Sequence, residues 1–257
     1  MFNYIWNTFL YIPILNSLII FYHFLFENLG LAIIALTIVL KVITYPLSKP
    51  MLEMSKKQRE LQPKIDELKK KYPKKEDLAK KQMELYKEHG INPAAGCLPQ
   101  IIQIVIVIAL YRVFTNLLNT NGVMISDINH LLYPFDFLKF ADGAQLNTQF
   151  LFWNLSKPDP YYILPVIAAI AQFVMSKYTM KSTKKLEKVA EKTPDKKDDI
   201  MYNMQEQMTY MMPIMTLVIG ISLPAGLVFY WFISTVIALG QYVLISRPKN
   251  ANGQKSN

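Results

Sequence analysis

Residues 29–48 read LGLAIIALTIVLKVITYPLS, and this stretch decides the fold. From Leu29 to Tyr45 it is long enough and apolar enough to cross a bilayer as a helix, apart from one charged residue, Lys41. A lysine well inside such a helix costs roughly 2.5–3.5 kcal/mol on insertion-based scales. Either Lys41 extends its ammonium group to the cytoplasmic surface, or its charge has a function within the membrane.

The whole chain alternates between apolar and polar blocks. It has 257 residues, of which 52% are hydrophobic and 18% charged, whereas soluble domains carry about a quarter charged residues. Long apolar blocks separated by polar ones are typical of membrane-spanning helices rather than of a soluble core. The sequence therefore predicts an all-α membrane protein with a five-transmembrane-helix core bundle, a cytoplasmic helical hairpin and an N-terminal interfacial helix.

The apolar and polar blocks divide the chain into ten segments. The first of them, 1–28, is apolar and aromatic, so it either lies at the extracytoplasmic interface or forms a sixth span. The expected segments are the N-terminal interfacial helix (1–28), the first span (29–46), the cytoplasmic helical hairpin (47–93), the second span (94–118), the extracytoplasmic loop (119–160), the third span (161–176), a cytoplasmic loop (177–207), the fourth span (208–223), the fifth span (226–245) and a cytoplasmic tail (246–257).

The basic residues report the orientation of these segments. Of 28 Lys and Arg, 13 lie between Lys49 and Lys87 and eight between Lys177 and Lys197. Cytoplasmic loops of membrane proteins carry such an excess, so both stretches and the C-terminus are predicted to be cytoplasmic. The net charge of +9 is therefore explained first by the orientation of the chain in the membrane and only second by affinity for anionic lipid or ribosomal RNA. No sequence-specific binding of nucleic acid is predicted.

The sequence lacks the signatures of several classes of enzyme. Cys97 is the sole cysteine, which excludes a disulfide framework and a cysteine-based metal site. No HExxH, GxSxG or P-loop pattern occurs, and no predicted span carries a pair of carboxylates. We therefore predict no enzymatic activity, no cofactor and no metal site.

Polar side chains recur within the first, second and fifth predicted spans. Such groups are not tolerated against lipid, so they either line a hydrated cavity or hydrogen-bond the helices to one another. For Lys41 the cavity is favoured, because the spans contain no carboxylate that could neutralise a lone cation. Arg112, by contrast, lies close enough to the outer end of its span to reach the surface. The candidate cavity residues are Lys41, Thr37, Gln100, Gln103, Tyr230, Trp231 and Ser234.

A methionine stripe runs into the fourth span at spacings of three and four residues. Such a stripe usually serves to pack helices together. Methionine also adapts well to varied apolar partners, so the stripe would equally suit a surface along which different hydrophobic helices slide. The candidate residues of this apolar slide are Met208, Met211 and Met215.

Four stretches together resemble the YidC-type membrane protein insertase family, in its short bacterial form without the large extracytoplasmic domain. They extend over most of the chain and follow the order of the family. The stretches are LTIVLKVITYPLS at 36–48, GCLPQIIQIVIVIALYR at 96–112, SKPDPYYILPVIAAIAQFVMSKYT at 156–179 and MMPIMTLVIGISLPAGLVFYWFIST at 211–235.

The resemblance implies a five-helix core around a hydrophilic groove, which is open to the cytoplasm and to lipid and closed on the outer side. A positive side chain in the first core span belongs to the family pattern, usually as arginine, and Lys41 falls at this position. Lysine keeps the charge but lacks the planar fork of arginine. Thr37, Tyr230, Trp231 and Ser234 fall where residues lining the groove are expected.

The function implied by the resemblance is the insertion of membrane proteins into the bacterial inner membrane. The implied partners are nascent membrane proteins and the lipid bilayer. The ribosome, through the basic loops and tail, and the Sec translocon are further candidates. Two alternatives remain open. A small solute or ion transporter would use the same polar cavity, and a purely chaperone-like assembly factor would lack insertion activity.

Overall fold

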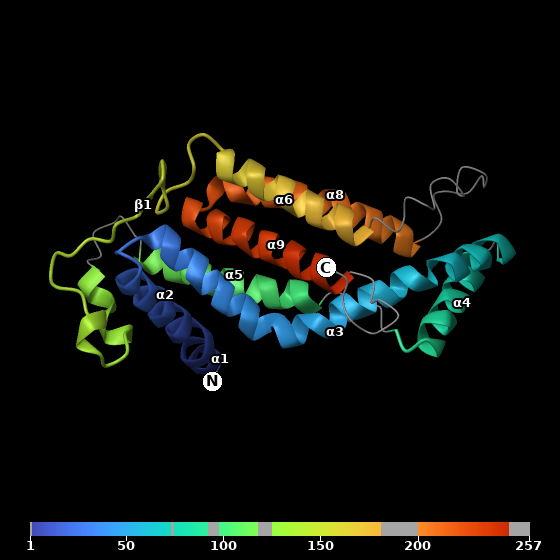
Figure 1. Cartoon of the computed structure of the whole chain (residues 1–257), viewed down its shortest axis with the longest axis horizontal. Helices are drawn as coiled ribbons and strands as arrows, with labels where there is room; N and C mark the ends of the chain where they lie inside the picture. The colour runs from blue at the N-terminus through green and yellow to red at the C-terminus, as the bar shows by residue number, and fades with distance from the viewer. Residues whose placement is uncertain (1, 73–74, 92–97, 118–124, 181–199, 247–257) are drawn as a thin grey trace.

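The computed structural model describes residues 2–72, 75–91, 98–117, 125–180 and 200–246, which are mostly helical. Figure 1 shows a bundle of helices with a loop segment gathered at one end, the loop end, and with α3 and α4 extending beyond the other, the hairpin end. The elements are α1 Phe2–Trp6, the π-helical turn η1 Asn7–Tyr11, α2 Ile12–Phe24, α3 Leu29–Lys71, α4 Lys75–Glu88, α5 Leu98–Leu117, the 3-10 turns η3 Ile125–Leu131 and η4 Asp136–Leu138, the strands β1 Gln149–Phe150 and β2 Trp153–Asn154, α6 Ile163–Met180, α8 Ile200–Ser222 and α9 Ala225–Ser246.

Three helical segments in the described part of the chain are long and apolar enough to cross a membrane, and three apolar helices are shorter. The N-terminal segment, predicted as an interfacial helix, is one of the long ones, so its length also permits a span. The long segments are Asn3–Phe24, Leu29–Pro50 and Ala225–Ile245, and the shorter ones are Ile101–Leu117, Ile163–Tyr178 and Tyr210–Ser222.

The bundle is tightly packed near the loop end and more open toward the hairpin end. Helix α9 packs against α3, α5 and α6, while α6 also packs against α8, and α2 against α3 (Figure 1). Along α3, buried side chains occur from Leu29 to Thr37, whereas every position from Ile38 to Pro50 is half-buried or exposed. The main apolar core therefore lies in the half of the bundle next to the loop.

Helix α3 is continuous over 43 residues. We expected the first span to end at residue 46 and a separate hairpin to follow, but the helix passes through Pro46, Pro50 and Pro63. A proline removes one backbone hydrogen bond and tends to kink a helix. The helix nevertheless continues, because its first part packs against α2 and α9 and its distal part against α4.

Helix α4 folds back along the distal part of α3 and forms a small second core with it. Leu61 and Ile65 of α3 are buried in this core with Tyr86 of α4 and Ile91 just beyond it. Gly90 adopts a φ of +65°, a left-handed conformation that ends a helix at little cost in glycine. The charged segment thus has a packed inner face and a solvated outer one.

The loop closes its end of the bundle through hydrogen bonds to the turn before α9. The N–H of Ala225 donates to the carbonyl of Lys157 at 2.8 Å, and the N–H of Gly226 donates to that of Leu155 at 2.9 Å. These two bonds satisfy backbone donors at the start of α9, which have no partner within the helix. The loop is therefore part of the packed structure at this end.

A buried carboxylate orders the entry into α6. Asp159 is almost fully buried and accepts hydrogen bonds from the N–H groups of Tyr161 at 3.0 Å and Leu164 at 2.8 Å. It also accepts one from the indole N–H of Trp153 at 3.2 Å. These three N–H donors compensate the carboxyl group, which would otherwise be costly to bury.

Gly30 provides a test of the packing at the loop end. A Cβ atom at Gly30 would overlap the ring of Phe150, whereas a Cβ atom at Gly240 would meet nothing within 4 Å. We expect Gly30→Ala to lower the stability of the purified protein in detergent by about 1–3 kcal/mol, the usual cost of overpacking. Gly240→Ala is the matched control and should leave the thermal unfolding midpoint unchanged or slightly higher. Equal midpoints for the two variants would contradict the close approach of Phe150 to α3.

Candidate functional site

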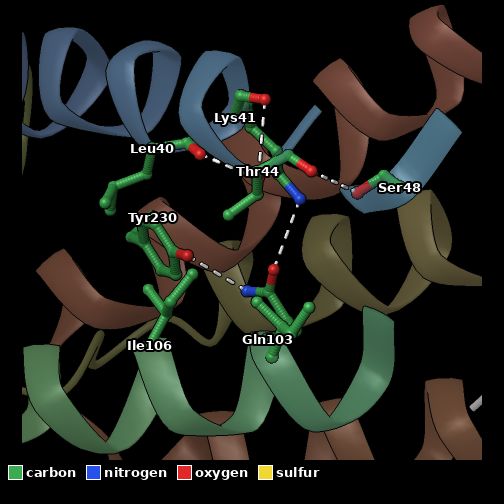
Figure 2. Close-up of a pocket in the computed structure, with 8 residues that line it drawn as sticks. Leu40, Lys41, Thr44, Ser48, Gln103, Ile106 and Tyr230 are labelled. Atoms are coloured by element: carbon green, nitrogen blue, oxygen red, sulfur yellow. Dashed lines mark hydrogen bonds between the residues drawn. The ribbon is translucent and has the colours of Figure 1, made fainter. Parts of the chain in front are cut away.

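A small polar cavity lies between α3, α5 and α9, on the hairpin-end side of the packed core. Its volume is about 40 Å³. Since one water needs roughly 10–15 Å³ of such space, the cavity has room for about three water molecules. Figure 2 shows the side chains that line the cavity. The lining residues are Leu40, Lys41, Thr44, Ser48, Ile102, Gln103, Ile106 and Tyr230.

The amide of Gln103 on α5 joins all three helices. Its Oε1 accepts hydrogen bonds from the Nζ of Lys41 on α3 at 3.3 Å and from the Oγ of Ser234 on α9 at 3.2 Å. Its Nε2 donates to the hydroxyl of Tyr230 on α9 at 3.2 Å, as Figure 2 shows. An ammonium group can only donate, so Lys41 fixes which end of the amide faces it.

Lys41 is a half-buried cation with a neutral partner. Within the described residues it forms no ion pair, and Gln103 offers it only a dipole. The ammonium group has three N–H donors, of which this hydrogen bond uses one. A buried charge without compensation is costly, so the adjoining cavity is expected to supply water to the remaining donors. The same donors would attract a negatively charged group that entered the cavity.

Thr44 and Ser48 line the cavity but were not among the predicted residues. The hydroxyl of Thr44 donates to the carbonyl of Leu40 at 2.8 Å, and that of Ser48 donates to the carbonyl of Thr44 at 3.0 Å. Because their protons are used within α3, the two oxygens remain available as acceptors. Residues 41, 44 and 48 recur at the spacing of one helical face, which is the signal that could have identified them.

The structure brings four of the seven predicted groove residues together and leaves the others apart. Thr37 is fully buried, and its hydroxyl donates to the carbonyl of Ile33 in its own helix at 2.6 Å. Trp231 is half-buried on α9 and is not among the residues that line the cavity. The side chain of Gln100 lies outside the described residues. The four residues that meet are Lys41, Gln103, Tyr230 and Ser234.

The methionine stripe faces outward on α8 where it is described. Met211 is 53% exposed and Met215 43%, and Ile214 and Val218 beside them are exposed as well. The side chain of Met208 lies outside the described residues. Met211 and Met215 are therefore free to contact lipid or another hydrophobic helix.

The chemistry of the cavity is that of hydrogen bonding and charge. In the part of the chain that the structure describes, no three His, Cys, Asp or Glu side chains gather closely enough to hold a metal ion. The polar groups that line the cavity are one ammonium, one amide, one phenol and two hydroxyls. Such a set can bind water and anionic or polar groups.

A comparison with protein families matches residues 20–252 to the 60Kd inner membrane protein family. The match includes every helix that contributes to the cavity. The chain belongs to this family. It is accordingly a multi-pass protein of the inner membrane, and its resemblance to the YidC-type insertases is confirmed.

Curated relatives are similar over nearly the whole chain. Membrane protein insertase YidC 2 of Listeria innocua is 32% identical over 98% of this chain and 76% of its own length. Membrane protein insertase MisCA of Bacillus subtilis is 31% identical over 90% of this chain and 76% of its own length. Membrane protein insertase YidC of Geobacter metallireducens is 31% identical over 94% of this chain, which spans 38% of that longer relative.

A solved structure has the same fold. A crystal structure of an active YidC insertase, with its first transmembrane domain resolved, matches this chain with a TM-score of 0.59 and 23% identity. The match covers 90% of this chain and 46% of that one. The likeness establishes the fold, while the roles of individual side chains are argued from the geometry around Lys41.

We expect the cavity to be reachable by water and the core beyond it to be dry. Thr44 lines the cavity, whereas Thr37 is fully buried two turns away on the same helix. In a Cys97→Ser background, Thr44→Cys should react with a water-soluble maleimide at least about tenfold faster than Thr37→Cys, because thiol reactivity follows exposure. Labelling is measured in reconstituted vesicles, and both variants should label fully after denaturation. Equal rates before denaturation would contradict the combination of a hydrated cavity and a dry core.

Proposed function

We propose that this chain is a membrane protein insertase. It moves the short polar tail of a client protein across the membrane through the polar cavity and releases the client's hydrophobic segment into lipid. The observation that carries this proposal is Lys41, a cation beside a cavity with room for water and without a carboxylate partner among the described residues. The names of the three relatives, each a membrane protein insertase, support it.

The proposed topology has five spans, formed by the first part of α3 and by α5, α6, α8 and α9. The hairpin, the loop 177–207 and the C-terminus are cytoplasmic, and the N-terminal helix lies at the outer interface. The 13 basic residues between Lys49 and Lys87 support this orientation through the positive-inside rule. The loop end is then the outer side, sealed by the core and by the bonds that Leu155 and Lys157 accept. The cavity opens toward the cytoplasm.

Capture of a client begins with charge. An acidic residue in its tail is attracted by Lys41 with about 4 kcal/mol at 4 Å if the effective dielectric constant is about 20. Water in the cavity lets the polar tail advance without being transferred into hydrocarbon. The membrane potential, positive outside, adds roughly 2.3 kcal/mol per 100 mV for each negative charge that crosses. Both effects favour short acidic tails.

Release of the hydrophobic segment follows the exposed apolar sides of α5 and α8. Ile101 and Ile104 on α5 and Met211 and Met215 on α8 are exposed and offer apolar surface along the helices. Burial of the segment in lipid gains about 25 cal/mol per Å² of apolar area, so the step needs no nucleotide. The flexible methionine side chains can adapt to clients of different shape.

The basic segments are the proposed contacts for partners on the cytoplasmic side. The client first meets the hairpin of α3 and α4 at the cytoplasmic face. The lysine-rich segments and the basic tail are candidate contacts for the ribosome, whose RNA is anionic. The Sec translocon is a further candidate partner, and nascent membrane proteins and lipid are partners by the nature of the activity.

The charge of Lys41 is the first element to test. We expect Lys41→Ala to reduce the insertion of a client with an acidic tail roughly tenfold, which corresponds to about 1.4 kcal/mol of lost attraction. Lys41→Arg keeps the charge and should preserve insertion. Insertion is measured by protease protection of a small client added to vesicles that contain the purified protein.

The client supplies the matched control for this experiment. A tail in which Asp is replaced by Asn should depend far less on Lys41, because the Coulomb attraction is gone. Full insertion of the acidic-tailed client by Lys41→Ala would refute the assigned role. An absence of insertion by the unaltered protein would favour the chaperone-like assembly factor instead.

A carboxylate beside Lys41 should have the same effect as removing its charge. Gln103→Glu places a negative group where the amide oxygen now lies, 3.3 Å from the Nζ of Lys41. We expect insertion of the acidic-tailed client to fall several-fold, since the resulting ion pair competes with the client. Gln172→Glu is the matched control, because Gln172 on α6 interacts with Thr235 instead. A normal rate with Gln103→Glu, measured by protease protection, would contradict capture of the tail by the free cation.

The transporter alternative makes a different prediction for the same variants. A solute or ion path needs several ionisable groups along its length or a pair of broken helices. A flux of small solutes or ions through vesicles that responds to Lys41→Ala would favour this alternative. Insertion without such a flux would favour the insertase.

A further inference from the structure

Arg112 lies on the side of α5 that faces away from the bundle. Ile101, Ile104, Ile108 and Tyr111 are 52%, 49%, 45% and 45% exposed, and their spacing of three and four residues places them along one helical face. Arg112 is also exposed and lies at the loop-end limit of this face. In a membrane-spanning bundle, such an apolar face contacts lipid. The guanidinium group is therefore at the lipid boundary and not in the polar cavity.

The N-terminal helix provides an aromatic partner for this arginine. The guanidinium carbon of Arg112 lies 5.5 Å from the ring centroid of Trp6 on α1, within the range of a cation–π interaction. One helical turn further along α5, the Nδ2 of Asn116 donates to the hydroxyl of Tyr11 at 2.7 Å. These contacts hold the first turns of the chain against α5 at Arg112 and one turn beyond it.

The position of Arg112 along α5 matches the headgroup region of a bilayer. It lies five residues before the end of the helix at Leu117, which is roughly 7.5 Å at 1.5 Å per residue. Arginine side chains at this depth extend toward the polar surface. Tryptophan is enriched at the same level of membrane proteins, so Trp6 is suited to this depth as well.

The charge of Arg112 is uncompensated within the chain as far as the structure describes it. No carboxylate among the described residues forms an ion pair with Arg112, and the undescribed stretch 118–124 that follows α5 contains no Asp or Glu. The ring of Trp6 can cover one face of the guanidinium. The N–H groups of the guanidinium, however, lie in the plane of that group, so the ring does not occupy them. Those in-plane donors match the geometry of a phosphate.

We propose that Arg112 and Trp6 form a binding site for the phosphate of an anionic phospholipid in the leaflet at the loop end. The phosphate accepts hydrogen bonds from the guanidinium, and the lipid chains extend along the apolar face of Ile104 and Ile108. Lipid is favoured over an acidic peptide because the charged group lies at the end of an exposed apolar face that runs along α5 from Ile101 to Tyr111. The site is separate from the cavity around Lys41.

The test is lipid retention by the full-length protein, measured by native mass spectrometry from micelles with equal amounts of phosphatidylglycerol and phosphatidylcholine. The unaltered chain should retain phosphatidylglycerol several-fold more than phosphatidylcholine. Arg112→Gln should remove this preference, Trp6→Leu should weaken it, and Arg112→Lys should keep a part of it. A preference that is the same in Arg112→Gln and in the unaltered chain would overturn the proposal, as would an unaltered chain with no preference.

Lys139→Gln is the matched control, since it removes a different cation, which lies in the loop that follows α5. Lys139 already has a partner, because its Nζ donates to Asp136 at 2.9 Å and holds the pKa of that carboxyl below its usual range. Its substitution should leave the lipid preference unchanged, and a loss with Lys139→Gln equal to that with Arg112→Gln would overturn the assignment to Arg112. Displacement of phosphatidylglycerol by a soluble acidic peptide would assign the site to polypeptide and refute the lipid. The readout is lipid retention, so it is independent of insertion activity.

Discussion

The structure depends on one constraint, which is that a cation without a carboxylate partner must be solvated inside an apolar bundle. The amide of Gln103 meets part of this need, and it also accepts a hydrogen bond from Ser234 and donates one to Tyr230. Each partner comes from a different helix than Lys41, so satisfying the charge also sets how α3, α5 and α9 lie relative to one another. A buried polar network supports a specific fold to the extent that its members are satisfied, and here the remaining donors of Lys41 face the cavity.

The gradient of packing along the bundle follows from the same constraint. Toward the loop end, α3 is packed by apolar neighbours, and Thr37 turns its hydroxyl back onto its own helix. One turn later, at Lys41, the apolar packing ends and the cavity begins. The cavity reduces the apolar packing at this point. Closing it would cost more, because the remaining N–H donors of the Lys41 ammonium group would then have no partner. The polar cavity and the apolar core at the loop end therefore meet between Thr37 and Lys41.

Helical periodicity predicted part of this site and failed on the rest for identifiable reasons. Periodicity identifies the face of a helix on which a residue lies, but not whether that part of the face packs in the core or lines the cavity. Thr37 shares a face with Lys41 yet lies in the core. Trp231 follows Tyr230 directly, and neighbours are turned by about 100° around a helix, so only one of the two can point into the cavity. The apolar blocks were sufficient to predict a mostly helical protein of the membrane. The bonds from Gly226 and Ala225 to the loop link residues far apart in sequence, and no local pattern reports them.

The unbroken course of α3 gives the molecule a mechanical property that a flexible linker would not. The small core around Leu61 lies 20 residues from Lys41, roughly 30 Å along a single rod. A load applied to α4 is therefore transmitted as tilt or torque to the wall of the cavity that carries Lys41, Thr44 and Ser48. Pro46 and Pro50 each interrupt the backbone hydrogen bonds between the two sites and are the most compliant points of the rod. The bending stiffness of α3 at these prolines determines how far a displacement of α4 moves Lys41.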